Sequence, residues 1–243
     1  MAFHVPWSIS MVFVLLVLGL LALTVVAVSE DDLALGLVGS EGRRRVLIAD
    51  VAITVWLMIT GGLALSGFFL EFQSVPPRFF ILLLVPLFAI GFLLRTRFAD
   101  DLVAALSPVW FIVPQGFRII MELILWLLFI NGIMPEQVTF EGRNFDILVG
   151  LTAPVVAWLC FVRRALPPSV AVAWNVLGLL LLANVVITAI LSAPTPFRVF
   201  MNEPAVTVIA YLPFVWLPAF VVPMAVLLHA LSLKQLLTVK AAR

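Results

Sequence analysis

The chain has 243 residues, of which 64% are hydrophobic and only 11% are charged, and its mean hydropathy is +1.24. A soluble domain has about 45–50% apolar and about 25% charged residues, so this composition excludes an ordinary soluble protein and predicts an integral membrane protein. The single Cys160 excludes an internal disulfide framework, and a net charge of +1 argues against binding to nucleic acid.

The apolar stretches predict an all-α bundle of seven transmembrane helices, because one span needs about 20 consecutive apolar residues. We expect the whole chain to form this single domain. The third and fifth stretches are short, so we expect them to extend into their flanks or to cross a thinner part of the bilayer. In chain order, the predicted spans are residues 6–28, 46–70, 79–94, 114–134, 146–162, 170–192 and 205–228.

Residues 101–113 are also apolar, but they would make the fourth span far too long. Proline disrupts a helix interior and is favoured in a first turn, so Pro114 marks the start of the span. We therefore predict that residues 101–113 form an interfacial segment. The first span could be mistaken for a signal peptide, but Met1–Trp7 carries no Lys or Arg, and the apolar stretch is too long for one.

Basic residues are distributed unevenly between the two sides of the predicted bundle. Cytoplasmic loops are enriched in Lys and Arg, so the asymmetry predicts an outside N-terminus and a cytoplasmic C-terminus in the cell membrane. One side carries Arg43, Arg44, Arg45, Arg95, Arg97, Arg163, Arg164, Lys234, Lys240 and Arg243, and the other carries only Arg78, Arg143 and Arg198.

A faint internal repeat would divide the helices into two parallel three-helix units joined by one linker helix. Pro77 and Pro86 follow the second span and are nine residues apart, as are Pro204 and Pro213 after the sixth. Membrane repeats are typically weak in sequence, although proline is frequent enough here to give this spacing by chance. The three-plus-one-plus-three plan is topologically similar to that of the SWEET sugar transporters, but that family's motif residues are not found in this chain.

The fourth span contains Arg118 and Glu122, which are four residues apart and therefore on one helix face. Arg118 is expected about 6 Å inside the membrane and Glu122 about 12 Å inside, at 1.5 Å per residue. Inserting a charge at the centre of a span costs about 2.5–3.5 kcal/mol, so charged residues at this depth are candidates for a structural or functional role. Two interpretations stand: a self-neutralised pair that orients the helix, or a proton- or cation-coupled carboxylate in a polar pathway.

Two further features could line such a pathway. Asp50 lies on a narrow polar stripe of the second span. Its position is explained equally well if it is an interfacial acid that balances the positive charge of the nearby Arg45. The seventh span contains Pro213, Pro218 and Pro223, each of which frees a backbone carbonyl. We expect a kinked helix there that moves or lines a ligand site.

The outer loop at residues 135–146 is the most polar stretch with mixed charge. Asn144 is suited to cap the fifth span, and Asp146 would then lie in its first turn, against the positive end of the helix dipole. Glu141 and Arg143 flank the turn and are candidates for recognition or gating.

No motif predicts an enzyme, a metal site or a cofactor, and we expect none. His4 and His229 lie on opposite sides of the predicted bundle, so they cannot share one metal or haem. The pattern H-E-x-x-H is missing, and Val38 interrupts a G-x-S-x-G pattern.

The sequence therefore predicts a transporter or channel-like protein of the lipid bilayer, with a polar pathway for a small molecule or ion near Glu122. The alternative is a non-catalytic membrane receptor or assembly partner that acts through its outer loop and its basic cytoplasmic face. A pathway predicts water at Glu122, whereas an assembly role predicts a dry pair with Arg118. The sequence identifies neither the substrate nor the oligomeric state.

Overall fold

The computed structural model describes residues 5–34 and 40–241, and His4, Val38 and Arg243, which the sequence argument used, lie outside these ranges. The described residues form helices and turns without a strand. The α-helices are α1 (Trp7–Ala34), α2 (Ser40–Leu65), α3 (Phe80–Leu93), α4 (Arg97–Ala105), α5 (Val109–Ile112), α6 (Phe117–Ile130), α7 (Ile147–Ala157), α8 (Pro168–Ser192) and α9 (Val222–Ala241). Shorter turns are η1 (Phe68–Leu70), η2 (Val113–Gly116), η3 (Glu136–Val138), η5 (Val208–Ala210) and the π-helical η4 (Trp158–Val162) and η6 (Leu217–Val221).

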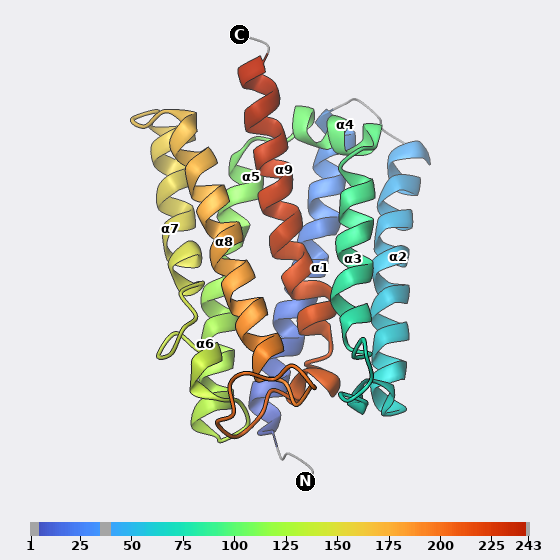
Figure 1. Cartoon of the computed structure of the whole chain (residues 1–243). Coiled ribbons are helices and arrows are strands. Elements are labelled where there is room, and N and C mark those ends of the chain that lie inside the picture. Colours follow the sequence, from blue (N-terminus) through green and yellow to red (C-terminus); the bar gives the residue numbers. More distant parts are fainter. Residues whose placement is uncertain (1–4, 35–39, 242–243) are drawn as a thin grey trace.

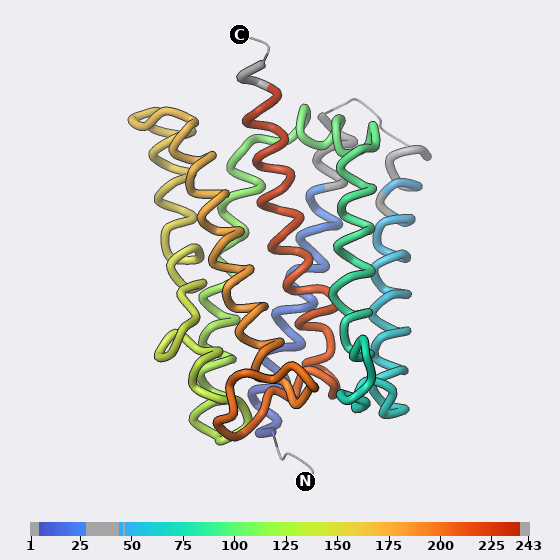
Figure 2. Tube along the Cα trace, in the orientation of Figure 1, coloured from blue at the N-terminus to red at the C-terminus, as the bar shows by residue number. Residues whose placement is uncertain are grey.

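The long helices run side by side along one axis of the bundle, while α4 lies across the end nearest the C-terminus (Figures 1 and 2). The two ends of the trace lie at opposite ends of the bundle. Helix α9 is central: it packs against α8, α3, α5 and α4. Inside the protein, 61% of its apolar span is buried, compared with 22% for α2, so α2 belongs to the outer layer.

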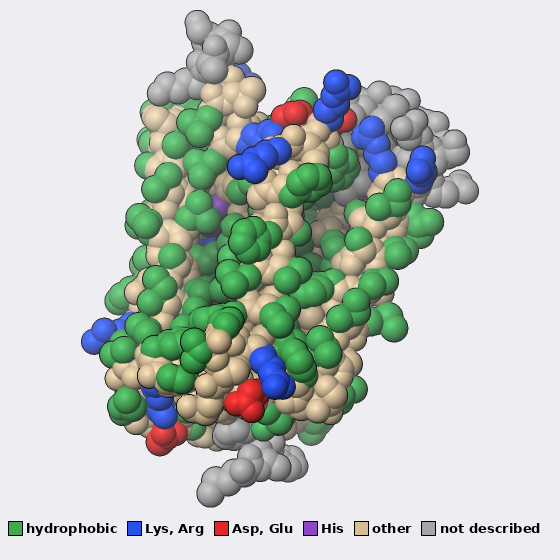
Figure 3. Space-filling model, turned by 45° about the vertical axis from the view of Figure 1, so that its right-hand side comes forward, with side chains coloured by type: hydrophobic (Ala, Val, Ile, Leu, Met, Phe, Trp, Pro, Cys, Tyr) green, Lys and Arg blue, Asp and Glu red, His purple; other side chains and the backbone are tan. Residues whose placement is uncertain are grey.

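Five helices are long and apolar enough to cross a membrane, which supports a multi-pass membrane protein. The helix α3 reaches that length only together with α4, from which it is bent by 76°, and the continuous segment Ile147–Val162 also falls short of it. The predicted count of seven spans is therefore not confirmed by length and composition. Hydrophobic side chains cover the middle of the face in Figure 3, and most charged side chains lie at its two ends, as a bilayer requires.

The fourth span differs from its prediction. It runs over Val109–Ile130, because the chain breaks at the extended Leu106 and not at Pro114. Pro114 lies inside the span, in the tighter turn η2, where the missing N–H of proline is tolerated. The expected interfacial segment therefore ends before Val109.

The seventh span also differs, because it begins at Leu217 instead of residue 205. Residues 193–216 form a connection that folds into the end of the bundle and buries apolar side chains, among them Val206, Phe214 and Val215. The apolar pattern of residues 205–216 thus reflects packing inside the protein and not contact with lipid. The predicted helix with three successive proline kinks is wrong, since Pro213 precedes the helical segment.

The proposed internal repeat is not confirmed. Pro86 lies inside α3, whereas Pro213 lies in the connection before η6, so the two prolines are not equivalent. Helix α3 is preceded by a short turn, but α9 is preceded by the long folded connection.

Candidate functional site

Arg118 and Glu122 lie deep in the bundle, on α6. Because the span begins at Val109, Arg118 is about 14 Å from that end and about 18 Å from Ile130, at 1.5 Å per residue. This is much deeper than the predicted 6 Å. The side chains are buried, with 1% of Arg118 and 2% of Glu122 exposed, so neither reaches the headgroups.

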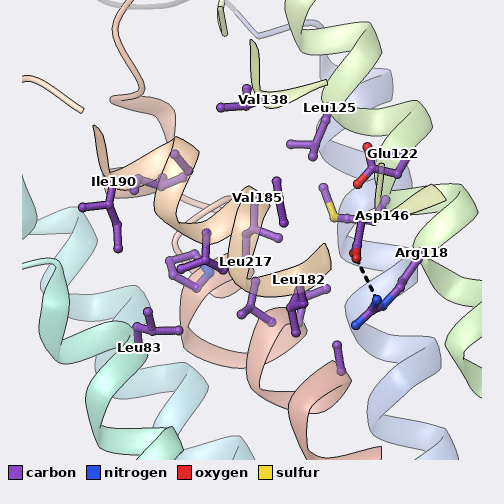
Figure 4. Close-up of a pocket in the computed structure, with 18 of the residues that line it drawn as sticks. Leu83, Arg118, Glu122, Leu125, Val138, Asp146, Leu182, Val185, Ile190 and Leu217 are labelled. Atoms are coloured by element: carbon purple, nitrogen blue, oxygen red, sulfur yellow. Dashed lines mark hydrogen bonds and ion pairs between the residues drawn. The ribbon is translucent and has the colours of Figure 1, made fainter. Parts of the chain in front are cut away.

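The ion-pair partner of Arg118 is Asp146, whereas one of the two interpretations of the sequence paired Arg118 with Glu122. Nη1 of Arg118 donates to Oδ1 of Asp146 over 2.7 Å (Figure 4). Asp146 immediately precedes α7, and its carboxylate is used for this ion pair instead of capping the helix. The chain after α6 therefore returns into the bundle before α7 begins, which brings together two residues that are 28 positions apart.

Glu122 is held by Asn144, from the same returning segment. Nδ2 of Asn144 donates to both carboxylate oxygens, over 2.7 and 2.8 Å, and to the carbonyl of Val138 over 3.1 Å. Its Oδ1 accepts the backbone N–H of Asp146 over 2.9 Å. Asn144 thus ties the loop to α6, which corrects the prediction that it caps the following helix.

A glycine allows α7 to approach this cluster. A Cβ at Gly150 would lie 2.8 Å from Cγ1 of Ile119 and 3.4 Å from Cβ of Arg118. Any larger residue would push α7 away from α6, so Gly150 permits the close contact that the ion pair needs.

A cavity of about 100 Å³ lies beside the ion pair. Arg118, Glu122 and Asp146 form its charged wall, and the rest of its lining is apolar, as with Leu83 of α3 and Leu182 of α8 (Figure 4). When all three ionisable groups are charged, the wall carries one positive and two negative charges. Nε and Nη2 of Arg118 have no hydrogen-bond partner among the described residues.

A second buried polar cluster joins α8 to α9. Asn175 donates through Nδ2 to Oγ of Ser232 over 2.9 Å and to the carbonyl of Ala171 over 2.8 Å. Its Oδ1 is therefore the acceptor for Nδ1 of His229, 2.8 Å away, and in the neutral imidazole Nε2 then carries no proton. That Nε2 has no partner within the described part of the chain.

The two clusters lie close together. A Cβ at Gly178 would be 2.5 Å from Cε1 and Nε2 of His229 and 3.4 Å from Cγ1 of Val149, which is in the first turn of α7 after Asp146. This site was not predicted from the sequence, because His229 was considered only as a possible partner of His4. Asn175 and Gly178, three residues apart on one face of the predicted sixth span, could have indicated a close polar contact.

Further buried polar groups continue towards both ends of the bundle. Gln137, in η3, donates to Oγ of Ser192 over 3.0 Å. At the other end, Gln235 donates to the carbonyls of Val103 and Leu106, over 2.6 and 2.7 Å. Buried polar contacts therefore occur at several levels between α6 and α9, inside a protein whose core is mostly apolar.

The remaining candidates lie apart from the cavity or at its edge. Asp50 is half-buried on α2, a helix that contributes no described residue to the cavity lining. Pro218 lines the cavity, whereas Pro213 does not. Pro223 removes the N–H that the carbonyl of Ala219 would accept in an α-helix, and Nε1 of Trp56 donates to that carbonyl instead, over 2.8 Å.

The four outer-loop candidates differ in their burial. Asn144 and Asp146 are buried, as described above, while Glu141 and Arg143 are exposed. Glu141 accepts a hydrogen bond from Nε1 of Trp126 over 2.8 Å, and the guanidinium of Arg143 lies 5.1 Å from the ring centre of Phe200. Both exposed side chains thus contact aromatic residues of the protein itself.

This fold and cavity define an all-α, multi-pass membrane protein with an ion pair buried near the middle of its bundle. The chain belongs to the family described as Domain of unknown function (DUF8737), whose match covers residues 76–237 and includes both polar clusters. No curated protein and no solved structure matches the chain.

Proposed function

We propose that this protein is a transporter that moves a small molecule or ion through a pathway containing the cavity between α3, α6, α8 and α9. The observation that carries the proposal is the charged wall of Arg118, Glu122 and Asp146 on this otherwise apolar cavity.

The number of buried ionisable groups supports this proposal. Each charge at the centre of a span costs about 2.5–3.5 kcal/mol on insertion scales, so a structural ion pair needs two groups and gains nothing from a third. Arg118 is already paired with Asp146 over 2.7 Å. Glu122 is therefore the extra group, and it is the one that can exchange a proton or a counter-ion during transport.

The chain path favours seven crossings with the N-terminus outside and the C-terminus in the cytoplasm. The two ends of the trace lie at opposite ends of the bundle, as an odd number of crossings requires. Helix α7 is short because the loop before it returns into the bundle, so α7 can complete a crossing that begins below the surface. The basic Arg45 and Lys234 pair with Asp101 and Asp100 of α4, at the proposed cytoplasmic end.

The receptor or assembly alternative depends on a free outer loop, and it has less support. Asn144 and Asp146 are committed to Glu122 and Arg118, and Glu141 is engaged with Trp126.

Cysteine labelling in membrane vesicles tests the pathway without knowledge of the substrate. In a Cys160→Ala background, Ala189→Cys places a thiol on the cavity wall, and Ile187→Cys places one two residues away on the 55% exposed, lipid-facing side of α8. Only a thiol that meets water ionises and reacts with a charged, water-soluble reagent. We expect labelling at position 189 and not at 187. A folded protein that is labelled at neither position would refute the transport proposal.

A further inference from the structure

Two nitrogens of the Arg118 guanidinium lack hydrogen-bond partners among the described residues, and they indicate what kind of ligand the cavity binds. Nη1 is used by Asp146, while Nε and Nη2 have no partner among the residues that the structure describes. These two nitrogens share one edge of the planar guanidinium, and their N–H bonds are parallel. A carboxylate fits such an edge with two parallel hydrogen bonds. The side chain is 1% exposed and lines the cavity, so the acceptor has to come from inside it.

We propose that this edge binds the carboxylate of a short-chain monocarboxylate, whose apolar tail occupies the cavity. The inference rests on the transport function proposed above and names the class of its substrate.

The size of the cavity limits the length of the tail. An apolar cavity of about 150 Å³ holds one benzene molecule with its six carbons. The cavity here is about 100 Å³, which corresponds to about four carbons on the same scale. Acetate to butyrate therefore fit within it, while the tail of a long-chain fatty acid would extend beyond it.

The charges near the edge require that a proton accompanies the anion. The titratable groups around it are Arg118 and Glu122 from α6, Asp146 before α7 and His229 from α9, and the described lining from α3 and α8 adds none. A bound carboxylate would raise the negative charges from two to three, against one arginine. Asp146 stays paired with Arg118, so the proton goes to the carboxylate of Glu122, which accepts only amide hydrogens from Asn144 among the described residues.

A cationic amine is the contrasting ligand class, because two carboxylates also line the wall. Both oxygens of Glu122 and Oδ1 of Asp146 already accept hydrogen bonds, whereas two N–H donors of Arg118, on the same wall, have no partner among the described residues. The unsatisfied side of the site therefore calls for an acceptor.

Thermal unfolding of the full chain in detergent tests this assignment with acetate, butyrate and decanoate, with butanol and butylammonium as matched compounds. We expect butyrate to raise the unfolding temperature more than decanoate, and more at acid than at neutral pH, with butanol and butylammonium inactive. Arg118→Lys keeps the charge but loses the parallel edge, and it should weaken butyrate binding by about tenfold or more. Arg143→Lys is the matched control on the outer loop and should bind normally.

A second variant keeps the test decisive if Arg118→Lys does not fold. Ala189→Leu narrows the cavity and leaves the three charged residues in place, so it should weaken butyrate more than acetate. Stabilisation by butylammonium alone, or equal butyrate binding in wild type and Ala189→Leu, would overturn the assignment. Labelling at position 189 without carboxylate binding would refute only this inference, and carboxylate binding without labelling would refute only transport.

Discussion

Removing the carboxylate of Asp146 should destabilise the protein far more than removing that of Glu122. The Arg118–Asp146 pair is almost fully buried, with 2% and 6% of the two side chains exposed. Two unit charges about 4 Å apart attract by about 4 kcal/mol at an effective dielectric constant of about 20. Breaking a buried pair from one side costs about 3–5 kcal/mol, because the remaining charge stays buried. We expect this loss for Asp146→Asn.

Glu122→Gln should cost about 1 kcal/mol or less. The new amide oxygen can still accept one hydrogen bond from Asn144, and the second is lost because the amide nitrogen is a donor. The change also removes one of two like charges from the cavity wall, which offsets part of that loss. Denaturant titration in detergent micelles measures both variants. The double variant Arg118→Gln, Asp146→Asn should recover about 2–3 kcal/mol relative to the sum of the single losses. If Arg118 instead couples more strongly to Glu122 than to Asp146, the ion pair described above is wrong.

The remaining predictions concern close helix contacts and the long connection before α9. Gly150→Ala and Gly178→Ala place a Cβ at 2.8 and 2.5 Å from neighbouring atoms, so each should cost about 1–3 kcal/mol in unfolding titrations, while Gly91→Ala, with nothing within 4 Å, should be neutral or stabilising. The hydrogen bond from Arg198 holds the pKa of Glu203 below its ordinary value of 4.5. That contact therefore stabilises the connection above about pH 4.5 and is lost as the pH falls through the lowered pKa. Proteolysis of the connection should increase there, and Glu203→Gln should abolish the pH dependence.

The helices could be predicted because lipid-facing and protein-facing residues are both apolar, so each long helix leaves an unbroken hydrophobic stretch. The same fact explains the error at residues 205–216, since hydropathy does not separate a buried connection from a span. Pro114 was misleading for a different reason. A local turn of tighter geometry absorbs a proline within a longer helical segment, and nothing in the surrounding composition indicates this.

The candidate site could be predicted only by its residues and not by its contacts. Arg118 and Glu122 were recognised because ionisable groups in a span are rare. Their partners Asp146 and Asn144 come from a loop that returns into the bundle, and helical spacing carries no information about such a path. The cluster of His229 and Asn175 likewise depends on the packing of α8 on α9, which a single sequence does not specify.

Two indole hydrogen bonds connect the outer helix α2 to the segment that forms part of the cavity wall. Trp56 of α2 donates to the carbonyl of Ala219, and Trp216, which precedes η6, donates to the carbonyl of Leu57 over 3.0 Å. Helix α2 therefore holds η6, which supplies part of the cavity wall, from both directions. Among the described helices that are long enough to span, α2 is the least buried in the protein. A movement of α2 away from η6 would therefore have to break both hydrogen bonds or carry this part of the cavity wall with it.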